Sequence, residues 1–188
     1  FNQTVDISAF GSYTITVYTS LDGDSGTSND SISADITNIN CAPVSDCAGF
    51  DDGFQLFQLG DIDNPSGCEG GYSNFTDLST DVELGETYGV TVTTGYGDQH
   101  VRIWIDFNDD FIFSTDEIVV SDYEIADGAA GGSYTETFQM TIPQDAVIGS
   151  HLMRVKSNWQ GTVPDDACAD TQYGETEDYM INIQPGAA

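Results

Sequence analysis

The twelve residues from Asp106 to Glu117, DFNDDFIFSTDE, place oxygen-bearing groups at regular intervals. Counted from Asp106, they match the ligand positions of a twelve-residue calcium loop, in which position 7 offers its backbone carbonyl. Positions 1, 3, 5, 7, 9 and 12 are held by Asp106, Asn108, Asp110, Ile112, Ser114 and Glu117. The stretch contains no His or Cys, which argues against zinc or copper. The pattern therefore predicts a Ca²⁺ site.

Two features of this stretch differ from an ordinary calcium loop. Its flanks look like strands rather than helices, and position 6 is Phe111, where a sharp bend prefers a residue that tolerates positive φ. We expect the turn to adopt another geometry, with Asp109 or Asp116 replacing a lost ligand. The alternative is a plain acidic turn between strands. The segment 22–30, DGDSGTSND, is a second and weaker calcium candidate.

The charge of the chain favours cations as partners. Its 188 residues contain 32 Asp plus Glu against 3 Lys plus Arg, a formal net charge of −29. Such a chain repels nucleic acid and anionic membrane surfaces, so we expect neither nucleic-acid binding nor direct membrane insertion. Bound divalent ions would relieve the self-repulsion of the folded state.

Catalytic patterns are weak in this sequence. A nucleophilic Ser or Cys needs a neighbouring base, and the candidates are His100 and His151, which have no G-x-S-x-G motif beside them. We expect both to be surface histidines at strand ends. An H-E-x-x-H zinc helix is also absent. The sequence therefore predicts a protein that is not an enzyme.

Aromatic residues suggest a carbohydrate-binding alternative. Trp159, Tyr96 and Tyr173 are the candidate ligand-binding aromatics, and they could form a stacking platform together with Trp104 and Tyr72. Trp104 lies in the middle of an apolar run, which favours a place in the core. Trp159 precedes a loop and is the better surface candidate. A sugar-binding site would require coplanar rings on one exposed face.

The pattern of residues along the chain predicts an all-β protein. Runs rich in Thr, Val, Ile, Tyr and Phe are separated by Gly, Asn, Asp and Ser, and about nine to eleven strands are expected in an antiparallel β-sandwich of the Ig-like or jelly-roll-like kind. The clearest runs are 12–20, 31–39, 86–95, 100–107, 117–125, 133–142, 151–159 and 177–183.

The amino-acid composition of the sequence changes near Asn40. Residues 1–40 contain no Cys, Trp or basic residue and supply about three strands, which look like the end of an Ig-like surface repeat or strands that dock on the next module. Residues 41–184 form the second expected domain, and residues 185–188 read as the start of a linker. Four cysteines without a C-x-x-C spacing favour disulfides and an oxidising compartment, and they allow three pairings.

Four segments carry distinctive motifs: GGYSNFTD at 70–77, VRIWIDFNDD at 101–110, IPQDAVIGSHLMRVK at 142–156 and YGETEDYMINI at 173–183. Together and in this order they resemble the GEVED domain of large secreted proteins from Bacteroidota-type bacteria. The resemblance covers about residues 41–184. Phe111 departs from it, since the family turn usually has Gly at that place.

This resemblance implies an extracellular or cell-surface module that serves adhesion or spacing, or that targets an attached domain. The expected partners are neighbouring domains of the same polypeptide, with an extracellular polysaccharide or another surface protein as further candidates. A carbohydrate-binding module is the alternative, and an accessory domain of a secreted protease is a third reading.

The resemblance also implies a disulfide pairing. It favours Cys41–Cys168 with Cys47–Cys68 over Cys41–Cys47 with Cys68–Cys168.

Two arginines occur within apolar strands and require carboxylate partners, because a buried unpaired guanidinium is costly. Arg102 and Arg154 are these residues. The acids of the signature segment, Glu175, Glu177 and Asp178, are the expected partners, because that strand must pair within the same sheet.

Overall fold

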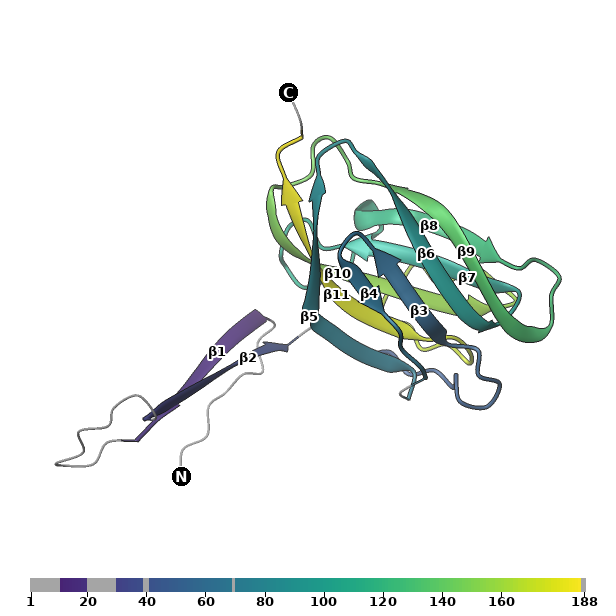
Figure 1. Ribbon diagram of the computed structural model, residues 1–188, viewed down its shortest axis with the longest axis horizontal. Coiled ribbons are helices and arrows are strands. Elements are labelled where there is room, and N and C mark those ends of the chain that lie inside the picture. The colour runs from purple at the N-terminus through teal and green to yellow at the C-terminus, as the bar shows by residue number, and fades with distance from the viewer. Residues whose placement is uncertain (1–10, 20–29, 39–40, 69, 187–188) are drawn as a thin grey trace. The chain divides into compact units, whose positions relative to one another are not determined.

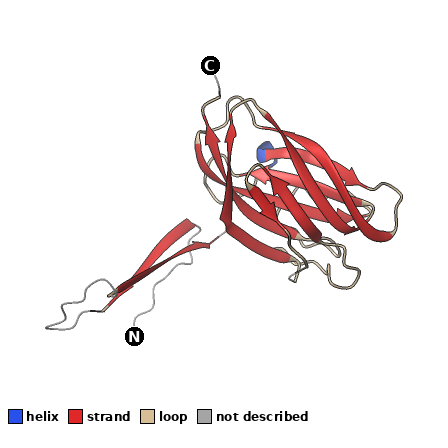
Figure 2. Cartoon of the chain, in the orientation of Figure 1, coloured by secondary structure: helices blue, strands red, loops and turns tan. Residues whose placement is uncertain are grey.

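The computed structural model describes residues 11–19, 30–38, 41–68 and 70–186, which divide into two compact units, Phe1–Asn40 and Cys41–Ala188. Strands make up nearly all of the regular structure (Figures 1 and 2). The predicted all-β class is confirmed. No helix among the described residues is long and apolar enough to cross a membrane.

The first unit contains a hairpin of β1 (Gly11–Tyr18) and β2 (Ser31–Asn38). The strands pair antiparallel, and Thr14 donates a hydrogen bond across the pair to Asp35 at 2.7 Å. About three strands were expected here, and two fall within the described residues. The weaker calcium candidate at 22–30 lies outside the described residues except for Asp30.

The second unit consists of two sheets. One has five strands in the order β5-β11-β10-β7-β8, and the other has four in the order β4-β3-β6-β9. The strand bounds are β3 Phe54–Leu59, β4 Ile62–Asn64, β5 Tyr72–Glu83, β6 Thr87–Tyr96, β7 Gln99–Ile105, β8 Ile118–Ile125, β9 Gly131–Thr141, β10 Gly149–Trp159 and β11 Thr176–Gln184. A short 3₁₀ helix, η2, spans Thr115–Glu117.

Alternating side chains of both sheets build the core between them. Val101, Ile103 and Ile105 of β7 belong to this core with Val155 of β10, and Val92 of β6 joins it from the other sheet. Residues of odd number on β7 therefore face the partner sheet, as period-two alternation requires.

The opposite face of the five-stranded sheet is also covered. Arg102, Trp104, Arg154 and Lys156 alternate with the core residues of β7 and β10, yet all four are buried. Arg154 and Lys156 donate hydrogen bonds to carbonyl oxygens of the segment 160–175, so this long loop lies over the outer face. The burial of both faces explains why these two strands are nearly continuous runs of buried residues.

One strand pair runs parallel. β11 pairs in parallel with β5, with a register irregularity between Asp178 and Met180, whereas the other described pairs are antiparallel. Two disulfides close the unit, Cys41–Cys168 and Cys47–Cys68. This is the pairing that the family resemblance implied.

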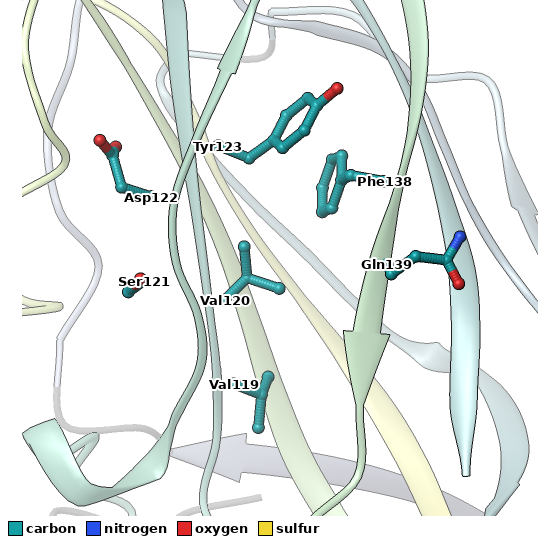
Figure 3. A pocket seen from close by; sticks show the side chains of 7 residues that line it. All are labelled: Val119, Val120, Ser121, Asp122, Tyr123, Phe138 and Gln139. Atoms are coloured by element: carbon teal, nitrogen blue, oxygen red, sulfur yellow. The ribbon is translucent and has the colours of Figure 1, made fainter.

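A groove lies where the edge strands β8 and β9 of the two sheets meet. Val119, Val120, Tyr123 and Phe138 contribute to its lining, and Tyr123 stacks on Phe138 with ring centroids 4.3 Å apart. Figure 3 shows Val120, Tyr123 and Phe138 turned toward one another, with the side chain of Asp122 directed away from them. The groove is thus an opening between two edge strands with both apolar and polar side chains in its lining.

Candidate functional site

The acidic turn joins β7 to β8 and is organised around Asp106. This carboxylate is 1% exposed and accepts hydrogen bonds from the backbone N–H groups of Asp110 at 3.2 Å and Phe111 at 2.8 Å. Burial raises the pKa of Asp106, the amide of Phe111 opposes that rise, and the nearby Glu117 carboxylate adds to it. Position 1 of the candidate loop is therefore a buried carboxylate held by amides.

Glu117, at position 12, closes the turn from the other side. Its carboxylate is 4% exposed and accepts hydrogen bonds from the N–H groups of Phe107 at 3.0 Å and Ser114 at 2.8 Å. Between these ends, Asn108 accepts from the N–H of Asp110, and Asp110 accepts from the N–H of Ile112. The side chains at positions 1, 3, 5 and 12 thus accept hydrogen bonds from backbone N–H groups of the same turn and hold its conformation.

The backbone of the turn keeps a left-handed conformation at two residues. Asp109 has φ 56° and Phe111 has φ 64°. The expectation that Phe111 would force a different geometry is wrong, because this residue adopts the positive φ that usually requires Gly. The amide bonds to Asp106 offset the local cost of about 1–2 kcal/mol.

The remaining predicted ligands lie at the surface. Asp116 and Ile112 are exposed. A tighter acidic group occurs elsewhere: Asp98, Glu124 and Asp127 have carboxylate oxygens within 4.8 Å of one another. No pattern in the sequence indicates this second group, because Asp98 is distant in the chain from Glu124 and Asp127 and all three occur in ordinary turn and strand contexts.

His151 differs from its prediction as a surface residue. Its side chain is 1% exposed, Nδ1 lies 2.9 Å from Asp109 Oδ1, and Nε2 lies 2.9 Å from the carbonyl oxygen of Val147. The turn therefore covers the start of β10. His100 is partly buried beside Asp122, with a separation of 2.9 Å.

Arg154 is the centre of the outer face of the five-stranded sheet. It lies directly opposite Asp178 on β11 and binds it through Nε and one Nη2 N–H, both at 2.8 Å. The other three N–H groups donate to the sulfur and carbonyl oxygen of Cys41 and to the carbonyl oxygen of Ala167. Tyr72 donates to the same carboxylate at 2.8 Å. All five guanidinium donors are satisfied, and both charged partners are fully buried.

The other acids of the signature segment have different partners from those predicted. Glu175 accepts hydrogen bonds from the N–H of Phe54 and the hydroxyl of Ser73, and Glu177 accepts one from the phenol of Tyr179. These donors are neutral, and the predicted pairing of the two glutamates with arginines is not among the contacts described. Strand alternation is the reason, because Glu175 and Glu177 face opposite to Asp178.

Arg102 also departs from the prediction. Its guanidinium binds Asp165 and the carbonyl oxygen of Ser121, not an acid of the signature segment. Asp165 lies in the loop that covers the outer face, a contact that strand pairing alone could not reveal.

Gly174 fixes the approach of the signature segment to β10. It has φ 82°, and an added Cβ would lie 2.2 Å from the carbonyl oxygen of Ser157. The sequence G-E-T-E-D thus combines a close backbone approach at Gly174, a carboxylate that caps Phe54, and a carboxylate that neutralises Arg154. The motif holds the sheet and its covering loop together.

Comparison with family models matches residues 100–182 to the GEVED domain. The second unit contains a GEVED domain. The match begins in β7 and ends in β11, so it includes the acidic turn, Arg154 and the signature segment. The family expected from the sequence is confirmed. No curated protein matches the chain.

One end of the GEVED-containing unit carries an aromatic pocket. Phe50, Asp52, Tyr96 and Trp159 line a small hollow with a cavity volume of about 30 Å³ that is partly open to solvent. Phe50 and Asp52 precede β3, Tyr96 ends β6, and Trp159 ends β10. Tyr173, just before β11, packs edge-to-face on Trp159 with centroids 5.1 Å apart. The three aromatics predicted as ligand-binding are therefore brought together, whereas Trp104 is buried elsewhere.

These rings do not form a platform. Tyr96 and Trp159 are inclined at 81°, Trp159 and Tyr173 at 90°, and Phe50 and Tyr173 at 71°. A carbohydrate-binding module would need exposed rings that are coplanar, whereas these rings are steeply inclined to one another. Asp52, which the sequence analysis missed, lies among them and is 1% exposed.

Proposed function

We propose that the chain is a non-catalytic, calcium-stabilised module of a secreted or cell-surface bacterial protein. It would serve adhesion or spacing, or target an attached domain. Support comes from the GEVED match, the two disulfides, and above all the acidic turn. Disulfides are typical of proteins in oxidising compartments.

The observation that carries the calcium proposal is the burial of Asp106 and Glu117 at positions 1 and 12. Their described hydrogen bonds come from uncharged backbone amides, which compensate a buried carboxylate less fully than a cation does. A hard cation bound to the free sides of these oxygens, with Asn108 and Asp110 beside it, would stabilise the turn. His100 and His151 are engaged by acids and a carbonyl, which supports a non-catalytic role.

Thermal unfolding tests the proposal. At a free calcium concentration 100 times Kd, binding to the folded state alone contributes about 2.7 kcal/mol. For a domain of this size, that raises Tm by about 5–10 °C relative to excess chelator. Asp106→Ala with Asp110→Ala should abolish the rise.

The matched control removes two acids of the other group, Glu124→Gln with Asp127→Asn, and should keep the full rise in Tm. Identical melting curves of the unmutated protein in calcium and in chelator would refute the calcium site. A rise that disappears in the control pair but persists in the turn variant would transfer the site to Asp98, Glu124 and Asp127.

A further inference from the structure

The aromatic pocket contains a buried carboxylate oxygen without a donor. Asp52 accepts the N–H of Gly174 through Oδ2 at 3.2 Å, while no donor among the described residues reaches its Oδ1. An unsatisfied buried carboxylate oxygen is costly, and such groups in folded proteins call for an explanation. Asp52 lines the hollow, so a bound group can supply the missing donor.

The position of Asp52 is fixed by its surroundings. Its N–H donates to the carbonyl oxygen of Cys47, which is bridged to Cys68. Ser45, in the same loop, donates to the carbonyl oxygen of Gly174 at 2.8 Å. The carboxylate is therefore held in place before any ligand arrives, which reduces the ordering cost of binding.

The walls of the pocket suit a cation. Three aromatic rings line the pocket, those of Phe50, Tyr96 and Trp159, and the rings of Tyr96 and Trp159 are inclined at 81°. The faces of aromatic rings attract ammonium groups. The cavity volume of about 30 Å³ is far below that of a drug-sized site, roughly 300–1,000 Å³, so the pocket accepts the end of one small functional group rather than a whole sugar chain. The net charge of −29 favours the approach of cations.

We propose that this pocket binds an alkylammonium group that carries N–H donors, such as a lysine side chain of a partner. The ammonium donates to Asp52 Oδ1, and the attached methylenes contact Trp159, Tyr96 and Phe50. A quaternary ammonium lacks a donor and would leave Asp52 unsatisfied. The pocket is separate from the acidic turn, so this inference does not depend on calcium.

Burial also raises the pKa of Asp52, the backbone amides of Gly174 and of Asp52 itself oppose that rise, and the charges of Asp46 and Asp51 add to it. A bound cation would favour the ionised carboxyl. Binding should therefore weaken as the pH falls through the range in which Asp52 becomes protonated.

Nuclear magnetic resonance of the two indole N–H groups provides the assay. Trp159 borders the pocket and Trp104 is fully buried in another part of the sheet, so one signal reports binding and the other serves as a reference. Trp159→Phe assigns the two signals. The unmutated protein is titrated with Nα-acetyl-lysine methylamide and with the same compound acetylated at Nε, which differs in the charge of the amine.

The lysine compound should shift the Trp159 signal in a saturable way, and the Nε-acetylated compound should bind at least about tenfold more weakly. The trimethylated lysine compound should also bind more weakly than lysine. Glucosamine and N-acetylglucosamine form a second matched pair, and a preference for glucosamine over both lysine compounds would assign the ammonium group to an amino sugar.

Asp52→Asn should weaken binding of the lysine compound at least about tenfold, while Asp51→Asn, which removes the same charge from an exposed neighbour, should change it less than about twofold. Tyr96→Leu provides an independent variant that leaves the carboxylate in place and should also weaken binding. Equal binding of charged and acetylated compounds, equal binding by Asp52→Asn, or no shift of the Trp159 signal with any amine would overturn the proposal.

Discussion

Replacing Arg154 by Met tests whether the ion pair with Asp178 organises the outer face of the GEVED-containing unit. The substitution keeps an apolar side chain of similar length but removes five hydrogen bonds. It leaves the Asp178 carboxylate, which is fully buried, with the Tyr72 hydroxyl as its remaining described side-chain partner. The carbonyl oxygens of Cys41 and Ala167 also lose their donor.

The expected loss in the free energy of unfolding is large because the substitution leaves the Asp178 carboxylate buried without its partner, not because the ion pair itself is strongly stabilising. Removing one partner of a buried ion pair costs about 3–5 kcal/mol, since the other charge stays buried without compensation. Tyr72 retains its bond to Asp178, so we expect a value near the lower end, about 3 kcal/mol. The measurement is urea unfolding at pH 7 with both disulfides intact, compared at unchanged slope with the unmutated protein.

A double-mutant cycle isolates the cause. Asp178→Leu alone leaves the guanidinium uncompensated and should be equally destabilising, whereas Arg154→Met with Asp178→Leu should lose much less than the sum of the two single changes. The reasoning fails if Arg154→Met costs less than about 0.5 kcal/mol, or if the two single losses simply add.

Two further predictions concern neighbours of this pair. Burial, with a further contribution from the charge of Arg154, lowers the pKa of Lys156 to about 8 from an ordinary value of 10.5. Between these values the unfolded chain binds more protons, so Lys156 makes the protein more stable as pH rises from 8 to 10.5. Lys156→Met should therefore stabilise the protein at pH 7 by on the order of 2–3 kcal/mol, and unfolding curves should show the gain shrinking toward pH 10.5; a gain independent of pH would contradict this. Gly174→Ala should destabilise by about 3 kcal/mol in the same assay, because of its φ of 82° and the close Ser157 carbonyl oxygen. The control Gly67→Ala, where an added Cβ meets nothing within 4 Å, should stay within about 0.5 kcal/mol.

Strands with a local period-two pattern could be predicted from the sequence. The runs 86–95, 133–142 and 151–159 correspond to β6, β9 and β10 within a few residues. β5 was missed because its polar sequence, YSNFTDLSTDVE, has no regular alternation of buried residues. Its parallel pairing with β11, a strand about one hundred residues away, and the bond from Tyr72 to Asp178 stabilise it instead.

The candidate sites show the same division between local and distant information. The candidate ligands of the acidic turn lie in one continuous segment, Asp106 to Glu117, so their spacing can be recognised from the sequence alone. The partners of Arg102 and Glu175 depend on which loop covers the sheet, and the sequence does not contain that information in a local form. No sequence pattern marks Asp52 as a site residue, because the pocket it lines also needs Trp159 and Tyr96, which the fold brings to it from other strands.

The Cys41–Cys168 disulfide, which joins residues 127 apart, also determines how the second unit responds to a pulling force. Tension applied between residue 41 and the end of β11 passes through the disulfide directly to Cys168, so the chain between the two cysteines bears no load. The extensible part is the sixteen residues from Ala169 to Gln184. At about 3.5 Å per extended residue, forced unfolding would lengthen the unit by no more than about 60 Å. With the disulfide reduced, the same pull could extend the whole unit several-fold further, so its oxidation state sets the maximum mechanical extension.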